Sequence, residues 1–288
     1  MKKWNKMLGL SLMSLSLAVV ATGCGSGSKE AAPSKPSGEQ KQNGNAATSQ
    51  GGSTLKAIKD RGKIVAGVKY DTHLFGEKDT KDNQVKGFDI DMVKAIAKDI
   101  LGDENKVELK EVTSKTRIPM LKNGDIDMIV ATMTITEDRK KEVDFSNVYF
   151  KAGQSLLVPN SSAVNGIADL KGKTVIAVKG STSTKNIREK APEAKVTEYE
   201  NYAEAFTALK SGKGDALTTD NAILLGMKEQ DSNFKLVGGL FTDEPYGIAI
   251  KKGDKEMVDA VNATLKKMED NGEYDKIYEK WFKEKPKK

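Results

Sequence analysis

The sequence predicts an α/β fold made of two similar lobes with a cleft between them. Short apolar runs that are typical of buried parallel strands alternate with segments of helical spacing, which favours a mostly parallel sheet. The plan of the first half also recurs in the second half, because the run 173–179 resembles the run 63–69 and the segment 209–215 resembles the segment 121–125. Open α/β sheets bind ligands beyond the carboxyl ends of their strands, so we expect a ligand site in the cleft.

Strand and helix signals alternate along the folded part of the chain. The expected elements are a strand at 63–69, a polar loop at 70–84, a helix from Gly87 to Gly102, a strand at 107–112, a short helix around Pro119, a strand at 128–131, and two final helices at 254–271 and 274–282. The apolar faces of the two final helices are expected to pack against the first lobe.

The chain is expected to cross between the lobes twice. The segment 144–158 would carry it into the second lobe, and the segment 241–250 would carry it back. The predicted first lobe therefore has two parts, 53–150 and 247–288, and the second lobe comprises 151–246.

Residues 1–52 are expected to lie outside the fold. Residues 1–23 indicate a lipoprotein signal peptide, in which lysines precede an apolar run that is too short to span a bilayer. Ala-Thr-Gly-Cys at 21–24 resembles a bacterial lipobox that would leave Cys24 as the lipidated first residue, although a larger aliphatic residue usually stands in place of Ala21. An ordinary signal peptide with an unrelated cysteine is the alternative. Residues 24–52 predict a flexible linker, so we expect a lipid-anchored protein on the extracytoplasmic face of the cell membrane.

Composition excludes several classes of site. The formal net charge is +6, but lysines are scattered among aspartates and glutamates, without a basic tract interleaved with aromatic residues, so no nucleic-acid partner is expected. One cysteine allows neither an intrachain disulfide nor a cysteine-rich metal site, and His73 is the only histidine. We expect no metal and no cofactor.

The stretch Ala-Thr-Met-Thr-Ile-Thr-Glu-Asp-Arg at 131–139 is the most informative part of the sequence. If Thr136 is the N-cap of a helix, a capping box would place Glu or Gln at the third helical position, where Arg139 stands. A cation there opposes the helix dipole at a cost of a few tenths to about 1 kcal/mol, and such local conflicts often mark functional sites. We therefore expect Arg139 to bind an anion, most simply a carboxylate. The alternative is a solvated cation paired with Glu142.

Four segments together resemble the polar amino-acid-binding proteins of ABC importers, the family 3 solute-binding proteins. They are 87–91 (Gly-Phe-Asp-Ile-Asp), 131–139, 144–146 (Asp-Phe-Ser) and 177–181 (Ala-Val-Lys-Gly-Ser). The resemblance covers residue 55 to the C-terminus and implies a type II periplasmic-binding-protein-like fold, with two lobes joined by two hinge strands that close on a ligand. It implies a monomer that captures an amino acid and delivers it to an ABC permease. A small-acid dehydratase or a sensor on the same fold is the alternative, although no acid–base pair is evident beyond Asp71, His73 and Glu77.

The resemblance assigns the common part of an amino acid to five residues. Arg139 would bind the α-carboxylate, helped by the backbone N–H groups of Thr134 and Ser183. Asp220 would bind the α-ammonium, together with the Thr132 carbonyl and the Thr134 hydroxyl. Two alternatives remain open, because residues 179–183 could be a simple strand-to-helix turn and Asp220 a helix cap.

Three further residues complete the predicted site. Thr182 stands next to Ser183, Thr219 stands next to Asp220, and Asp71 follows the first predicted strand.

Ser114 and Arg117 are predicted to recognise the ligand side chain. The segment that holds them is most similar to glutamate/aspartate-binding members, in which the matching arginine meets a side-chain carboxylate, whereas glutamine binders tend to have an aromatic residue in place of Ser114. Arg117 and Arg139 against Asp220 leave one positive charge, which an acidic amino acid would neutralise. The expected ligand is therefore glutamate or aspartate. Glutamine or another polar amino acid is the alternative, as is an Arg117 that pairs with Glu111 and points away.

Overall fold

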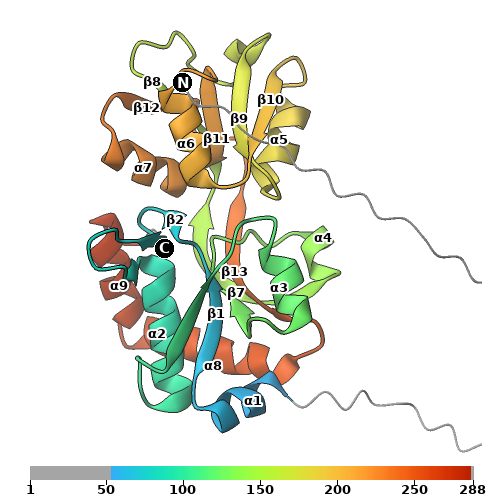
Figure 1. The fold of residues 1–288 in the computed structure, drawn as a ribbon, viewed down its shortest axis with the longest axis vertical. Helices are drawn as coiled ribbons and strands as arrows, with labels where there is room; N and C mark the ends of the chain where they lie inside the picture. The colour runs from blue at the N-terminus through green and yellow to red at the C-terminus, as the bar shows by residue number, and fades with distance from the viewer. Residues whose placement is uncertain (1–52, 287–288) are drawn as a thin grey trace, which may run out of the picture. The chain divides into compact units, whose positions relative to one another are not determined.

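The computed structural model describes residues 53–286. The predicted signal peptide, the lipidated Cys24 and the linker at 24–52 lie outside the described residues. Two five-stranded sheets organise the described part, and each defines a lobe together with its helices (Figure 1). Within residues 53–286, no helix is both long enough and apolar enough to cross a bilayer.

The sheet of the first lobe has the strand order β5-β1-β6-β13-β7. Its strands are β1 (Ile64–Val68), β5 (Val107–Glu111), β6 (Met128–Ile129), β7 (Val143–Ala152) and β13 (Glu244–Lys251). Its helices are α1 (Thr54–Arg61), α2 (Phe88–Leu101), α3 (Arg117–Asn123), α4 (Glu137–Lys140), α8 (Lys255–Asp270) and α9 (Glu273–Phe282). The strands β5, β1 and β6 are parallel, and β13 runs antiparallel to both of its neighbours. The carboxyl ends of β1 and β6 therefore lie at the same edge of the sheet.

The sheet of the second lobe has the order β10-β9-β11-β8-β12. Its strands are β8 (Gln154–Pro159), β9 (Thr174–Val178), β10 (Lys195–Tyr199), β11 (Ala216–Asp220) and β12 (Phe234–Val237). Its helices are the 3-10 turn η1 (Ile167–Leu170) and α5 (Thr182–Lys190), α6 (Tyr202–Lys210) and α7 (Asn221–Gln230). The strand β8 pairs antiparallel with β11, just as β13 pairs with β6 in the first lobe. The expected two-lobed α/β fold is confirmed.

The internal repeat of the sequence is also visible in the hydrogen bonds. In each lobe, an aspartate exchanges two hydrogen bonds with a residue of a strand. Asp127 donates its backbone N–H to Val65 O (2.8 Å) and accepts the Val65 N–H through Oδ2 (2.7 Å). Asp215 and Thr174 exchange the same two bonds in the second lobe, both at 2.8 Å. The structural partner of Asp215 is therefore Asp127, two residues beyond the Asp125 that the sequence comparison aligned with it.

Two neighbouring segments connect the lobes. The strand β7 of the first sheet leads through Gly153 into β8 of the second sheet, and the chain returns into β13 at Glu244 (Figure 1). The two segments are tied together, because the Gln154 N–H donates to Thr242 Oγ1 (3.0 Å) and the Phe241 N–H donates to Gln154 O (3.0 Å).

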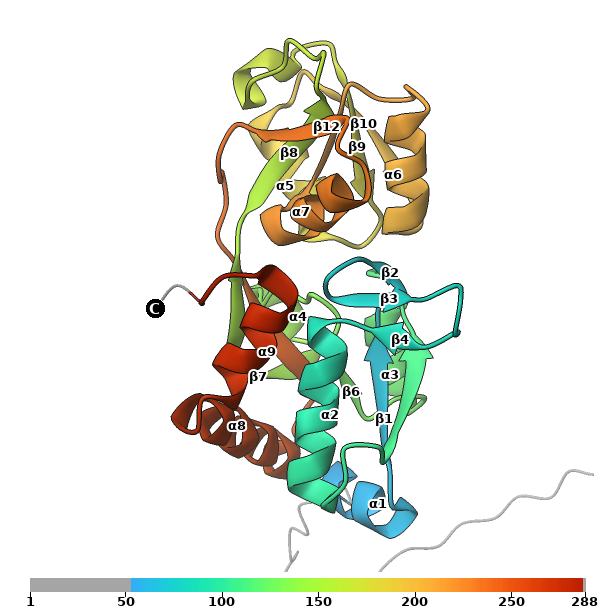
Figure 2. The same cartoon turned by 90° about the vertical axis from the view of Figure 1, so that its left-hand side faces the viewer.

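The segment 70–84, predicted to be a polar loop, holds part of a small antiparallel sheet. Its strands are β2 (Asp71–Thr72), β3 (Gly76–Lys78) and β4 (Val85–Lys86). The sheet forms because the turn between β2 and β3 buries Leu74 and Phe75, and the Phe75 ring packs among the rings of Phe88, Phe150 and Phe282. Figure 2 shows this small sheet on the side of the first lobe that faces α6 and α7.

Candidate ligand-binding site

Polar side chains from both lobes meet where the strands of the two sheets end. Three of the hydrogen bonds that join the lobes lie there. Arg139 Nη2 donates to Gly180 O (3.1 Å), the Tyr202 N–H donates to Asp71 Oδ2 (2.6 Å), and Tyr246 Oη donates to Asp220 Oδ2 (2.5 Å). We call this region the cleft site and describe its residues in turn.

Arg139 has the position in α4 that the sequence predicts. Thr136 is the N-cap, and its side chain accepts the Arg139 N–H at 3.2 Å. The guanidinium spans the lobes, since Nη1 donates to Thr134 O at 2.7 Å while Nη2 reaches Gly180 O. Burial lowers the pKa of Arg139, and Asp220 and Glu244 oppose that effect. Glu142 pairs with Lys122 (3.1 Å), so the alternative of a surface Arg139–Glu142 pair is wrong.

Asp220 ends β11 and stands at the N-cap position of α7, but its side chain makes no capping hydrogen bond. Instead, Oδ2 accepts from the Tyr246 hydroxyl, and the buried Oδ1 has no partner. Burial, followed by the nearby Glu244, raises the pKa of Asp220 to about 7. The alternative of a helix cap therefore does not account for this carboxyl group.

Arg117 begins α3 and is 2% exposed. Nη1 donates to the carbonyl of Ala131 (2.6 Å) and lies 3.4 Å from the carbonyl of Thr132, while the buried Nε has no partner. Burial, followed by the charge of Arg139, lowers the pKa of Arg117 to about 9. Arg117 therefore points into the cleft site and does not pair with Glu111 on the exposed side.

Lys69 and Tyr202 are cleft residues that the sequence analysis missed. Lys69 follows β1 and is fully buried, and its Nζ donates to Ser114 Oγ (3.1 Å). The same Nζ lies 5.0 Å from the centroid of the Tyr202 ring in the second lobe. Burial lowers the pKa of Lys69 to about 8, against the opposing charge of Asp71. The position of Lys69 in the sequence could have identified it as a cleft residue, because Lys69 ends a predicted strand at the same sheet edge as Thr132.

These additions correct the predicted charge balance of the site. The ionisable groups that act on one another comprise three cations and five carboxylates: Lys69, Arg117, Arg139, Asp71, Asp89, Glu111, Asp220 and Glu244. The sequence-based balance counted only Arg117, Arg139 and Asp220, and so left one positive charge over. With the complete set that excess disappears, and the electrostatic argument for an acidic ligand is wrong.

The remaining predicted residues divide between the cleft and the hinge. Ser183 Oγ lies 3.5 Å from Thr219 Oγ1, which donates to the Tyr202 hydroxyl at 3.1 Å. Thr182 Oγ1 instead donates to Glu244 Oε2 (2.8 Å). The hydroxyl of Thr182 therefore belongs to a network around the connecting segments, whereas Ser183 and Thr219 lie beside Tyr202.

Unpaired polar atoms converge in the cleft site. Within residues 53–286, four buried side-chain N or O atoms have no hydrogen-bond partner, and three of them are Arg117 Nε, Thr132 Oγ1 and Asp220 Oδ1. Buried polar groups are nearly always paired, so a cluster of unpaired donors and acceptors indicates the place where the polar atoms of a ligand are accepted. Thr132 also has φ 45°, a strained value for a β-branched residue of the kind that concentrates at binding sites.

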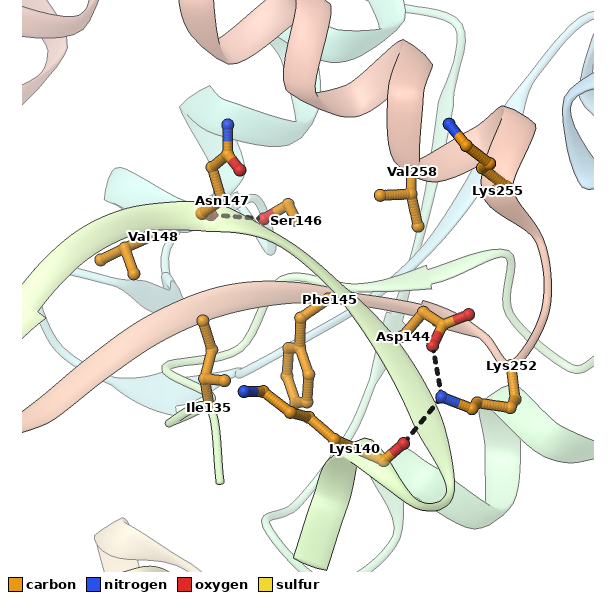
Figure 3. A pocket seen from close by; sticks show the side chains of 10 residues that line it. All are labelled: Ile135, Lys140, Asp144, Phe145, Ser146, Asn147, Val148, Lys252, Lys255 and Val258. Atoms are coloured by element: carbon orange, nitrogen blue, oxygen red, sulfur yellow. Dashed lines mark hydrogen bonds and ion pairs between the residues drawn. The ribbon is translucent and has the colours of Figure 1, made fainter. Parts of the chain in front are cut away.

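A hollow of about 600 Å³ lies elsewhere on the first lobe. Figure 3 shows it between β7, the end of α4 and the start of α8. Its lysines already have partners: Lys140 with Glu137 (2.8 Å), Lys252 with Asp144 (2.6 Å) and Lys255 with Asp259 (2.5 Å). A smaller hollow of about 200 Å³, which includes Asp71, His73 and Tyr202, lies at the rim of the cleft. The unpaired buried atoms, and not the volume of a hollow, indicate the candidate ligand site.

The fold and the cleft define a two-lobed protein that encloses a small polar ligand. Residues 64–284 match the bacterial extracellular solute-binding proteins, family 3, and the chain belongs to this family.

Three known proteins illustrate the similarity. The chain is 60% identical over 283 residues to the ABC transporter glutamine-binding protein GlnH of Bacillus subtilis (strain 168), covering 98% of this chain and 99% of that protein. It is 55% identical over 262 residues to a glutamine-binding protein of Geobacillus stearothermophilus, covering 91% and 98%. The solved structure of an ancestral arginine-binding protein bound to glutamine matches with a TM-score of 0.73 and 46% identity, covering 78% and 99%. All three are named as binding proteins and not as enzymes.

Proposed function

We propose that this protein captures glutamine in the cleft site and delivers it to an ABC permease. The charge balance of the cleft carries this proposal. Carboxylates outnumber cations there, and burial already raises the pKa of Asp89 and Asp220 to about 7. Another buried negative charge from glutamate or aspartate is therefore disfavoured, whereas a ligand with no net charge adds none. The high identity to two glutamine-binding proteins supports the same ligand.

The common part of the amino acid would lie between Arg139 and Asp220. A guanidinium suits a carboxylate because it can donate two parallel hydrogen bonds. The unpaired Asp220 Oδ1 suits an ammonium group, and a bound ammonium would lower the raised pKa of this carboxyl. The backbone N–H groups of Thr134 and Ser183 are proposed to complete the carboxylate site.

The side-chain amide would lie toward Arg117 and Lys69. An amide presents both an acceptor oxygen and a donor NH₂ group, whereas a carboxylate only accepts. The unpaired Arg117 Nε can donate to the amide oxygen. Thr132 Oγ1 and Asp71 offer acceptors for the amide NH₂ group.

Calorimetry on the purified protein, freed of bound ligand by unfolding and refolding, tests the ligand. We expect glutamine to bind with a Kd of micromolar or tighter, about −8 kcal/mol. Glutamate, aspartate and arginine should bind at least about tenfold more weakly, a difference of about 1.4 kcal/mol. Equal or tighter binding of glutamate would instead support the second candidate, an acidic amino acid held by Arg117 beside Lys69. Chromatography of the ligand after prolonged incubation should recover it unchanged, and turnover would favour an enzyme.

We also propose that a lipid on Cys24 anchors the protein to the membrane. The lipobox-like segment 21–24 and the extracellular family support this proposal. In cells that produce the Cys24→Ser variant, the protein should move from the membrane fraction to the medium, because the acyl chains supply the membrane affinity. Membrane retention of this variant equal to that of the unchanged protein would contradict lipid anchoring.

A further inference from the structure

The motif Gly-Phe-Asp-Ile-Asp at 87–91 contains a buried carboxylate to which no ligand role has been given. Asp89 is fully buried in the first turn of α2. Its Oδ2 accepts the backbone N–H of Thr132 (3.0 Å), and its Oδ1 accepts the hydroxyl of Tyr149 (2.9 Å). The backbone of Asp89 is itself held, since its N–H donates to Phe75 O at 3.0 Å. Asp89 therefore joins α2 to the turn that follows β6.

That turn contains the strained residue of the cleft site. Thr132 has φ 45°, in the left-handed region that β-branched residues rarely occupy. Such a conformation persists only where surrounding contacts hold it. The Asp89 carboxylate is the partner of the Thr132 N–H, so it is the contact that acts directly on this peptide group.

The same turn orients Arg117. The carbonyls of Ala131 and Thr132 both face Arg117 Nη1, at 2.6 Å and 3.4 Å. The Ala131 carbonyl belongs to the same peptide group as the Thr132 N–H that Asp89 binds, and the Thr132 carbonyl belongs to the next peptide group. If the Thr132 peptide rotated, the carbonyl acceptors would turn away from Nη1. The Arg117 guanidinium, including its unpaired Nε, would then no longer be held in its present orientation.

We propose that Asp89 is a positioning residue that holds the Ala131–Thr132 turn in its left-handed form and thereby aims Arg117 at the ligand side chain. The inference rests on the proposed function, because it assigns Asp89 an effect on glutamine affinity. Asp89 touches no ligand in this account. It acts through Thr132 on Arg117.

A double-mutant cycle on the full chain tests the connection. Glutamine Kd is measured for the unchanged protein and for Asp89→Leu, Arg117→Gln and the double variant. We expect Asp89→Leu to weaken binding at least about tenfold alone but less than about threefold in the Arg117→Gln background, because residues that act through one another give non-additive effects. Equal fold-losses in both backgrounds would overturn the inference.

Two conservative variants separate positioning from a general loss of structure. Asp89→Asn keeps an acceptor for the Thr132 N–H and can donate to the Tyr149 hydroxyl, so glutamine affinity should stay within about threefold of the unchanged protein. Thr132→Gly adopts the left-handed conformation without strain, so Asp89→Leu should cost less affinity in that background. A large loss in Asp89→Asn, or the same loss with Thr132→Gly as without it, would contradict the proposal.

Controls distinguish this proposal from failure of the proposed function. Thr264→Val removes a hydrogen bond to Asp99 (2.9 Å) that joins α8 to α2 away from the cleft. It should lower Tm and leave glutamine Kd unchanged, and a matching loss of affinity would mean that any loss of stability produces the Asp89 effect. If Asp89→Leu does not fold, Asp89→Ala takes its place in the same cycle, because it also removes both carboxylate acceptors. Absence of glutamine binding by the unchanged protein would reject the proposed function itself, whereas additive effects with intact binding would reject only the role of Asp89.

Discussion

The two arginines of the cleft site are held in different ways. Arg117 donates only to carbonyls of its own lobe, those of Ala131 and Thr132. Arg139 donates to Thr134 O in the first lobe and to Gly180 O in the second. Arg117 can therefore be oriented by the first lobe alone, whereas the full set of Arg139 contacts exists only when the lobes are closed.

This difference separates the groups that can select the ligand side chain from the groups that stabilise the closed form of the two lobes. A pre-oriented Arg117 and its neighbours can select a side chain while the lobes are apart, at little cost in ordering. Groups that meet only on closure, such as Arg139 with Gly180 and Asp71 with the Tyr202 N–H, stabilise the closed form specifically. A ligand shifts the protein toward closure only by binding that form more tightly. The following predictions test this division, from the largest expected effect to the smallest.

Arg139→Ala should remove the proposed partner of the ligand α-carboxylate, and it should also remove one hydrogen bond between the lobes. Truncating one member of a buried charged pair typically costs about 2–5 kcal/mol, so glutamine affinity should fall by at least about 30-fold. Calorimetry measures the loss. The matched control is Arg188→Ala, which removes a surface arginine that pairs with Glu198 on the second lobe and should leave Kd unchanged. A glutamine Kd for Arg139→Ala within tenfold of that of the unchanged protein would contradict the role proposed for Arg139.

Gly180→Ala should weaken binding by opposing closure. A Cβ at Gly180 would lie 2.8 Å from the backbone N and Cα of Lys115 in the opposite lobe. Gly180 also has φ +75°, so alanine adds left-handed strain of about 1–2 kcal/mol. Because that strain is present in both the open and the closed form, it lowers stability, whereas the clash exists only in the closed form and lowers affinity.

Gly172→Ala is the matched control for this prediction. Gly172 has a similar φ of +71°, but no atom lies within 4 Å of its added Cβ. Both variants should lose stability by chemical denaturation. Only Gly180→Ala should lose glutamine affinity, by about tenfold, which corresponds to about 1.4 kcal/mol. Equal affinities for the two variants would show that the lobes do not approach each other here in the bound form.

Gly226→Ala should change stability and affinity in opposite directions. Gly226 lies inside α7, where alanine favours the helix by about 1 kcal/mol. A Cβ there would lie 2.8 Å from His73 O in the first lobe. We expect the ligand-free Tm to rise while glutamine binding weakens a few-fold, as measured by calorimetry. Tighter binding would exclude a contact between α7 and the β2–β3 turn in the bound form.

The last prediction concerns the pH dependence of stability, and not affinity, and involves Asp220. Burial raises the pKa of Asp220 from its ordinary 3.8 to about 7, so between these values the folded protein binds more protons than the unfolded chain. The free energy of unfolding contributed by this group therefore falls as the pH rises from about 4 to about 7. Asp220→Asn should flatten that decline in denaturation experiments from pH 4 to pH 7. An unchanged slope would mean that Asp220 is not buried in the ligand-free protein.

Much of the fold follows from local patterns in the sequence. Apolar runs, helical spacing and terminal glycines located β1, α2 and α3, and the conflict at Arg139 marked the N-cap of Thr136 correctly. These features depend on neighbours a few residues apart, and such interactions can be evaluated from the chain alone. The small sheet β2–β3–β4 was missed because its stability comes from Phe75 packing against rings that are distant in sequence.

The sequence by itself determined the fold class, and it predicted that Arg139 and Asp220 belong to one site. Only the tertiary structure decided the charge balance of the cleft. Lys69 and Asp89 are ordinary polar residues in the sequence, and Glu244 lies more than 100 residues from Arg139. Folding brings these groups together and removes them from water, which strengthens their mutual interactions and shifts their pKa values. The net charge that a ligand must have is thus a property of the assembled site, and no single segment contains it.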